Sequence, residues 1–125
     1  MLDTHAVLWW FNGHPSLSTA ARVLIGGDEH HVFVSPVSAM EIATKHRFGK
    51  LPEARALSAK FEEMVEHEGF SAVPVTIPHA RLAGQMNIDH RDPFDRLLIA
   101  QALIEGLTLV SNERLFDTSG VSRLW

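Results

Sequence analysis

Carboxylate side chains stand beside several apolar segments of this sequence. Asp3, Glu41, Asp95 and Glu113 lie on separate segments, each next to a stretch that can be buried. Carboxylate oxygens are the ligands that Mg²⁺ prefers, and carboxylates drawn together repel one another unless a cation neutralises them. A bound Mg²⁺ stabilises charge on phosphoryl oxygens and lowers the pKa of a water molecule, which can then attack a phosphodiester. The acids therefore predict a Mg²⁺ site suited to cleaving phosphodiester bonds.

Only a fold that brings these segments together can build such a site. Turn residues and short apolar runs predict a brief apolar start at Leu2 and strands over residues 31–35, 70–75, 107–111 and 121–125. Helices are predicted after Asp3 through Phe11, from Ser16 or Ser18 to Ile25, and over residues 38–49, 53–68, 78–86 and 93–105. Such alternation predicts an α/β fold whose parallel sheet is covered on both faces. Sites in these sheets form beyond the carboxyl ends of the strands, where the acids are expected to lie.

Each acid also has a structural explanation that the sequence leaves open. Glu41 fits the last position of an S-x-x-E capping box that begins at Ser38. Asp95 would be favoured by the dipole of a helix that begins near it, and Glu113 fits a solvated turn. Asp3 has the least structural reason to be an acid, because it lies in the apolar stretch LDTHAVLWWF.

Composition narrows the class of protein. The 125 residues fit one domain spanning residues 1–125, and 46% hydrophobic with 21% charged residues is typical of a globular chain. A net charge of −4 argues against a protein that coats nucleic acid through bulk charge, although it does not exclude a nuclease. The absence of cysteine excludes disulfides and thiolate metal sites. The longest apolar run, residues 6–11, is too short to cross a membrane, so no membrane partner is expected.

Basic and aromatic residues suggest surfaces beyond the acids. Positive charge that rims an acidic centre suits a polyanionic substrate, and such residues are Lys45, His46, Arg47, Lys50, Arg91, Arg96 and Arg114. His5 and His90 lie beside candidate acids and are candidates for substrate contact, although a structural role is the simpler explanation. Trp9, Trp10 and Phe48 suggest apolar surface that a partner chain or a second subunit covers, with packing in the core as the alternative.

Several motifs together resemble the PIN domain, specifically the VapC-type toxins of bacterial toxin–antitoxin pairs. They are LDTHAVLWW, SPVSAMEIATKHRFGKL, HRDPFDRLLIAQALIEGLTLVSNE and the terminal VSRLW, and they cover nearly the whole chain. The resemblance implies a three-layer α/β/α sandwich with a central parallel sheet. It also implies a Mg²⁺- or Mn²⁺-dependent endoribonuclease that cuts structured RNA such as tRNA or rRNA in the cytoplasm. Inhibition by a VapB-type antitoxin and a homodimeric toxin are further implications.

The resemblance assigns the acids one at a time. The first acid of the family falls on Asp3 in LDTH, the helical glutamate on Glu41 in SAMEIA, and the third acid on Asp95 in DPFDRLLIA. The fourth, usually an aspartate, falls on Glu113, whose longer arm leaves the number of metal ions open. Asp92, which with the following proline also fits a helix N-cap, is an additional acid that would assist. Family members usually carry a few more residues before LDTH, so a short first strand is expected.

Two other functions are compatible with parts of this pattern. A PIN fold with a decayed metal site would act as a binding module, but the presence of Asp3, Glu41 and Asp95 argues against it. A phosphoryl-transfer domain with a phosphorylated Asp3 would not by itself need acids on several other segments. Detection of an aspartyl phosphate after incubation with a phosphoryl donor would separate that chemistry from hydrolysis.

Overall fold

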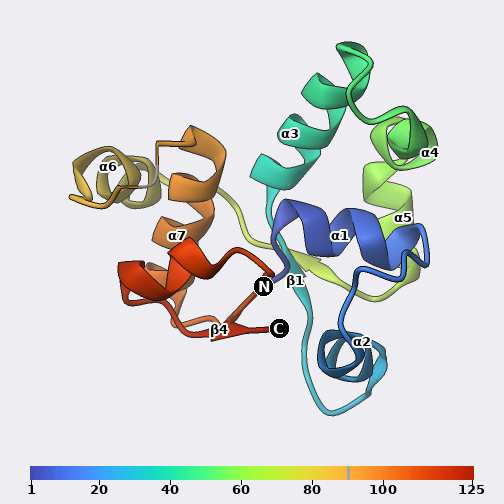
Figure 1. Cartoon of the computed structure of the whole chain (residues 1–125), viewed down its shortest axis with the longest axis horizontal. Helices are drawn as coiled ribbons and strands as arrows, with labels where there is room; N and C mark the ends of the chain where they lie inside the picture. The colour runs from blue at the N-terminus through green and yellow to red at the C-terminus, as the bar shows by residue number, and fades with distance from the viewer. Residues whose placement is uncertain (90) are drawn as a thin grey trace.

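A computed structural model describes residues 1–89 and 91–125 of the chain (Figure 1). The strands are short and all pair in parallel: β1 (Phe33–Val34) with β2 (Ser71–Ala72), and β3 (Leu109–Val110) with β4 (Arg123–Leu124). Around them lie α1 (Thr4–Phe11), α2 (Thr19–Gly26), α3 (Pro36–Arg47), α4 (Arg55–Ala59), α5 (Phe61–His67), α6 (Ile77–Gln85) and α7 (Pro93–Glu105). Short 3₁₀ helices, η1 (Pro52–Ala54) and η2 (Arg114–Ser119), complete the described elements.

The first residues of the chain join the two pairs of strands. The Leu2 N–H donates to the Phe33 carbonyl of β1 at 2.9 Å, and the Asp3 N–H donates to the Val110 carbonyl of β3 at 3.1 Å. Leu2 also forms a parallel bridge with Val110. The strand order is therefore β2, β1, the segment around Leu2, β3 and β4. The short first strand expected from the sequence is confirmed, since this segment forms only an isolated bridge.

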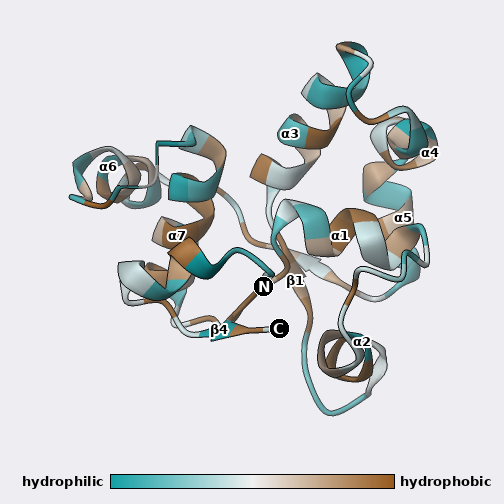
Figure 2. Cartoon of the chain, viewed as in Figure 1, coloured by the Kyte–Doolittle hydropathy of each residue, from teal (hydrophilic) through white to brown (hydrophobic). Residues whose placement is uncertain are grey.

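Two hydrophobic clusters lie on opposite faces of this sheet. Neighbouring residues of a strand point to opposite faces, and Leu2, Val34 and Val110 belong to one cluster, whereas Met1 and Leu109 belong to the other. The first cluster packs under α1, α2, α4 and α5, and the second under α7 and η2. Figure 1 shows these two groups of helices on either side of β1, and Figure 2 shows β1 itself in hydrophobic colour. The α/β sandwich predicted from the sequence is confirmed.

The predicted strands and long helix differ from the structure in their extent. Each predicted strand contains an observed one, but the regular pairing covers two residues in each. The single helix predicted over residues 53–68 is wrong, because η1, α4 and α5 replace it and the chain bends at Lys60, whose φ is −135°. Neither glycine nor proline marks this bend. Leu57 and Val65 are both buried, so the apolar period survives although the helix does not.

A buried glutamine ties together the elements that carry the acids. Gln101 on α7 is fully buried, and its Oε1 accepts from the Ser35 hydroxyl at 2.6 Å while its Nε2 donates to the Val73 carbonyl at 2.8 Å. Ser35 in turn caps the start of α3, since its hydroxyl oxygen accepts from the Val37 N–H at 3.0 Å. These bonds fix the start of α3 and the end of β2 against α7.

We expect Gln101→Leu to lower the free energy of unfolding by about 2–4 kcal/mol, because a buried hydroxyl and a buried carbonyl lose their partners. Chemical denaturation measures this difference. The control is Ile104→Gln on the same helix, an exposed position where about 0.5 kcal/mol or less is expected. Equal effects from the two substitutions would show that the buried bonds do not matter.

Candidate metal centre

Backbone and side-chain bonds hold Asp3 at the carboxyl edge of the sheet. Its Oδ1 caps α1 by accepting from the Ala6 N–H at 2.6 Å, and its side chain also bonds the Ser111 hydroxyl. Only 3% of Asp3 is exposed. Burial raises the pKa of Asp3, the bonds from Ser111 and Ala6 oppose this rise, and the nearby Glu41 carboxylate adds to it. The carboxylate is therefore costly to ionise in the absence of a cation.

Glu41 is a second buried acid and lies on α3. It is 3% exposed, and its two carboxylate oxygens accept from the Thr4 hydroxyl of α1 and from the Lys45 ammonium one turn further along α3. The capping-box explanation of Glu41 is wrong. Proline at residue 36 starts the helix one turn before the proposed box, with Ser35 as its N-cap. Glu41 therefore has no capping role, and its burial calls for another reason.

Asp92 and Asp95 occupy the start of α7, and their roles differ. Asp92 is the N-cap, with its Oδ1 accepting from the Phe94 N–H at 2.8 Å, as the Asp-Pro sequence predicted. Asp95 lies in the first turn and is half-buried. Its pKa is raised to about 7, mainly by burial and then by the nearby carboxylates of Asp92, Glu41, Asp3 and Glu113, in that order of strength. The negative charges of the other four acids therefore all raise the pKa of Asp95.

Glu113 follows β3 and shapes the turn there. Its own N–H donates to the Ser111 hydroxyl oxygen at 3.0 Å, and its Oε1 accepts from the Leu115 N–H at 3.1 Å to cap η2. The turn explanation of Glu113 is therefore correct for one of its oxygens. The charge of Glu113 still raises the pKa of Asp95, so capping of η2 is compatible with a place in the acidic site.

The predicted acids thus come from separate elements and interact through their charges at one edge of the sheet. As the side chains stand, however, no three aspartate, glutamate or histidine residues within 1–89 and 91–125 are arranged to hold one metal ion. The oxygens of Glu41 face Thr4 and Lys45, and one oxygen of Asp3 faces Ala6. The donor set nevertheless fits a hard divalent cation, because it consists of carboxylates whose ionisation costs energy until a positive charge arrives.

Sequence reasoning missed the side chains that hold these acids in place. Thr4 and Lys45 bind Glu41, and Ser111 bonds Asp3. Thr4 and Ser111 are both buried, as is Ser38, whose hydroxyl oxygen lies 3.2 Å from that of Thr4. A signal was present in part, since Thr4 directly follows Asp3, and Lys45 lies at the i+4 position from Glu41 where a helical ion pair forms.

The basic rim predicted from the sequence is only partly available. Arg96 does not point outward to a substrate, because its guanidinium donates to the Ala83, Ile88 and Met86 carbonyls at the end of α6. Arg96 therefore anchors α6 to α7. His5 is exposed beside Asp3 and stays a candidate for substrate contact, whereas His90 lies outside the described residues.

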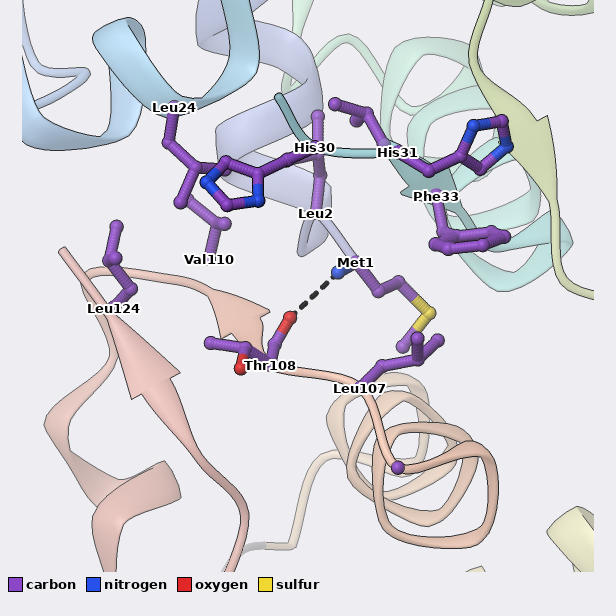
Figure 3. A pocket seen from close by; sticks show the side chains of 12 residues that line it. Met1, Leu2, Leu24, His30, His31, Phe33, Leu107, Thr108, Val110 and Leu124 are labelled. Carbon is purple, nitrogen blue, oxygen red and sulfur yellow. Dashed lines mark hydrogen bonds between the residues drawn. The ribbon is translucent and has the colours of Figure 1, made fainter. Parts of the chain in front are cut away.

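A separate pocket of about 270 Å³ lies at the opposite edge of the sheet, where the strands begin (Figure 3). Met1, Phe33 and Thr108 are among its lining residues, and the Met1 amino group donates to the Thr108 carbonyl at 2.7 Å. His30 and His31 also line it, but Figure 3 shows their rings pointing away from each other. Because the pocket lies at the other edge of the sheet and none of the candidate acids lines it, it is not part of the acidic site.

The fold and this edge define a parallel α/β sandwich whose carboxylates gather where the strands end. The PIN domain family model matches residues 1–119, and the chain belongs to the PIN domain family. Proteins of this family are generally metal-dependent nucleases that bind RNA. No curated protein is significantly similar to the chain. None of the described helices combines the length and the apolar character needed to span a bilayer.

The raised pKa of Asp95 predicts how stability depends on pH when no metal is bound. A carboxyl that titrates near 7 in the folded protein and near 4 in the unfolded chain destabilises the fold as pH rises from 4 to 7. Asp95→Asn removes this cost. In EDTA at pH 8 we expect it to raise the free energy of unfolding by about 1–2 kcal/mol, allowing for solvent screening of a half-buried group.

Thermal and chemical denaturation at pH 8 and pH 4 test this expectation. The gain from Asp95→Asn should shrink toward pH 4, where the wild-type carboxyl is protonated in the folded protein and about half protonated in the unfolded chain. Asp28→Asn, at an exposed acid, is the matched control and should change little at either pH. A gain that is the same at both pH values would show that the charge of Asp95 is not its source.

Proposed function

We propose that this chain is a Mg²⁺-dependent endoribonuclease, with Mn²⁺ as an alternative cation, and that Asp3, Glu41 and Asp95 hold the metal. Glu113 is the fourth ligand, and Asp92 assists from the start of α7. The observation that carries the proposal is the burial of Asp3 and Glu41, each 3% exposed, at the edge of the sheet where α7 begins with Asp95. The raised pKa of Asp95 agrees with it, because the neighbouring carboxylates contribute to that rise. Carboxylates that raise one another's pKa at a single edge of the sheet are best explained by a cation that neutralises them.

A cation held by Asp3, Glu41 and Asp95 would supply Lewis-acid stabilisation of charge on the phosphodiester and would lower the pKa of a water nucleophile. The residues of the chain arrange its ligands. Thr4 and Lys45 fix Glu41 from both sides, so that this side chain need not be ordered when substrate arrives. Ser111 bonds Asp3 and accepts from the Glu113 N–H, and it therefore couples the first and fourth acids.

The finer assignment within the family rests on the sequence motifs. We propose that the chain is a VapC-type toxin, because HRDPFDRLLIAQA, SAMEIA and LDTH resemble those of such toxins over nearly the whole chain. Its substrate would be a structured RNA such as tRNA or rRNA in the cytoplasm, and a VapB-type antitoxin would inhibit it. We also propose that residues 1–125 act as one domain and that the toxin is a homodimer.

The apolar surface expected for these partners is smaller than the sequence suggested. Trp9 and Trp10 are half-buried and pack against a core cluster, so core packing is their main role. Phe48, in contrast, is 62% exposed. The two tryptophans therefore do not form the centre of an exposed apolar surface that a partner chain could cover.

Metal binding tests the ligand assignment directly. Titration of Mg²⁺ and Mn²⁺ into the metal-free protein by calorimetry should give a binding isotherm for the wild type and none for Asp3→Asn. Asp28→Asn, which removes an exposed acid elsewhere, should bind as the wild type does. Equal binding by Asp3→Asn and the wild type would remove Asp3 from the site.

Catalysis tests the roles of the individual acids. We expect EDTA to abolish cleavage of RNA and Asp95→Asn to slow single-turnover cleavage by about 10³-fold or more, while the protein stays folded. Asp92→Asn should lose less, because asparagine also caps a helix, and Glu113→Gln should fall between them. The measurement is cleavage of one RNA, chosen from total RNA fragments mapped by sequencing, with melting curves in parallel.

The alternatives make different predictions in the same experiment. A binding module would bind RNA but leave it uncut with either metal. If Asp95→Asn cuts normally while Asp92→Asn is inactive, the choice between these aspartates is wrong. If every substitution leaves cleavage intact, the carboxylate site is not the catalytic centre.

A further inference from the structure

The far end of α3 exposes an aromatic ring that the fold does not use. Phe48 is the C-cap residue of α3 and is 62% exposed, and it belongs to neither of the two core clusters. A phenylalanine in this position contributes little to folding, because most of its ring stays in water. Figure 1 shows α3 projecting from the centre of the molecule to its rim, where the chain turns toward α4. The ring therefore stands on a projecting end of the molecule.

The ring lies within the most basic stretch of the chain. Residues 45–55 contain Lys45, Arg47, Lys50 and Arg55 against one acid, Glu53, although the whole chain carries a net charge of −4. Arg47 and Lys50 are exposed on either side of Phe48 in the sequence. Positive charge concentrated at one end of an otherwise acidic protein indicates a local polyanion contact rather than general attraction to nucleic acid.

Arg47 and Phe48 are already arranged as a stack. The Arg47 guanidinium carbon lies 4.4 Å from the centroid of the Phe48 ring and covers one of its faces. A cation–π contact at an exposed site contributes about 0.5–1 kcal/mol and favours this arrangement of the two side chains. The exposed remainder of the ring is a flat apolar surface beside a positive charge. Proteins bind unpaired bases on such surfaces, because every base has a π-face and its phosphate needs a cation nearby.

The distance to the acidic site suits a bound strand. Phe48 follows Glu41 by seven residues on α3, which at 1.5 Å per residue is about 10 Å along the helix. At a rise of about 3.4 Å per nucleotide, this length corresponds to about three stacked nucleotides. Lys45, which pairs with Glu41, lies between Glu41 and Phe48 along this length. One strand can therefore reach both the acids and the ring along α3.

We infer that Phe48 is a stacking platform for an unpaired base of the RNA substrate, about three nucleotides from the scissile phosphate, with Arg47 and Lys50 binding the adjacent phosphates. The inference rests on the proposed ribonuclease function and adds the kind of RNA it prefers, one with an unpaired nucleotide near the cut. Charge favours RNA over a protein partner here, because the exposed Arg47 and Lys50 beside the ring suit the phosphates on either side of a stacked base.

Binding of the RNA in EDTA, which removes the cation that cleavage needs, tests the inference without relying on turnover. Fluorescence anisotropy should show about a tenfold weaker Kd for Phe48→Ala and nearly wild-type affinity for Phe48→Trp. Ile77→Ala is the matched control, because Ile77 is an 85% exposed apolar residue at the start of α6 and should leave Kd unchanged. When Mg²⁺ is added to the same RNA, Phe48→Ala should raise KM and leave kcat nearly unchanged.

Salt and abasic sites identify the kind of contact. Lys50→Gln should reduce the slope of log K against log salt by about one, whereas Phe48→Ala should leave the slope unchanged, because stacking releases no counterion. Abasic nucleotides scanned along the RNA on both sides of the cut should weaken wild-type binding about tenfold at one unpaired position. At that position, Phe48→Ala should add no further loss.

Several outcomes would overturn the inference. Unchanged RNA affinity of Phe48→Ala, or abasic losses that simply add to those of Phe48→Ala, would exclude stacking on this ring. If Phe48→Ala instead dissociates a dimer seen by light scattering while RNA affinity is kept, the ring belongs to a protein interface. If the wild type neither cuts nor binds RNA, the proposed function fails together with the inference. If the wild type cuts RNA and Phe48→Ala binds and cuts it equally well, the inference alone is rejected.

Discussion

The passage of the first residues between two pairs of strands is the constraint on which this structure depends. Leu2 bonds to Phe33 on one side, and Asp3 bonds to Val110 on the other, so that a few backbone hydrogen bonds join both halves of the molecule. The alternation of Met1 and Leu2 between the two core clusters fixes the register, because a slip of one residue would expose both side chains to the wrong face. The same register places Asp3 at the carboxyl edge of the sheet. The first acid of the site is thus set by the pairing that completes the sheet.

The acidic edge combines buried charge with incomplete compensation. Glu41 has a cation and a hydroxyl as partners, whereas burial and the other acids raise the pKa of Asp3 and Asp95. Buried acids that repel one another oppose folding, so these residues lower the stability of the metal-free protein. Under the proposed function, binding of the cation would recover the free energy that these acids cost. The buried bonds of Gln101 and the Arg96 clamp keep α7 in place while this repulsion acts on it.

Much of the architecture followed from local signals in the sequence. The Asp92 cap and the Gly106 stop delimit α7 as predicted, since Gly106 has a φ of 65° that favours glycine at a helix end. The division of the 53–68 helix and the true start of α3 did not follow. Neither glycine nor proline stands at the bend at Lys60, and both Ser35 and Ser38 are residues that could cap α3. Both outcomes depend on how the helices meet the core, which a periodic pattern does not record.

The sequence by itself determined the candidate acids, the apolar segments that bring them to the carboxyl edge of the sheet, and the motifs of the PIN family. These properties are local, because residue type, spacing and period are written along the chain. Only the tertiary structure decided that Thr4, Lys45 and Ser111 hold the acids, that Arg96 is an anchor for α6, and that Phe48 stays in water. Contacts between segments far apart in the chain, and the burial that shifts a pKa, exist only once those segments have packed together.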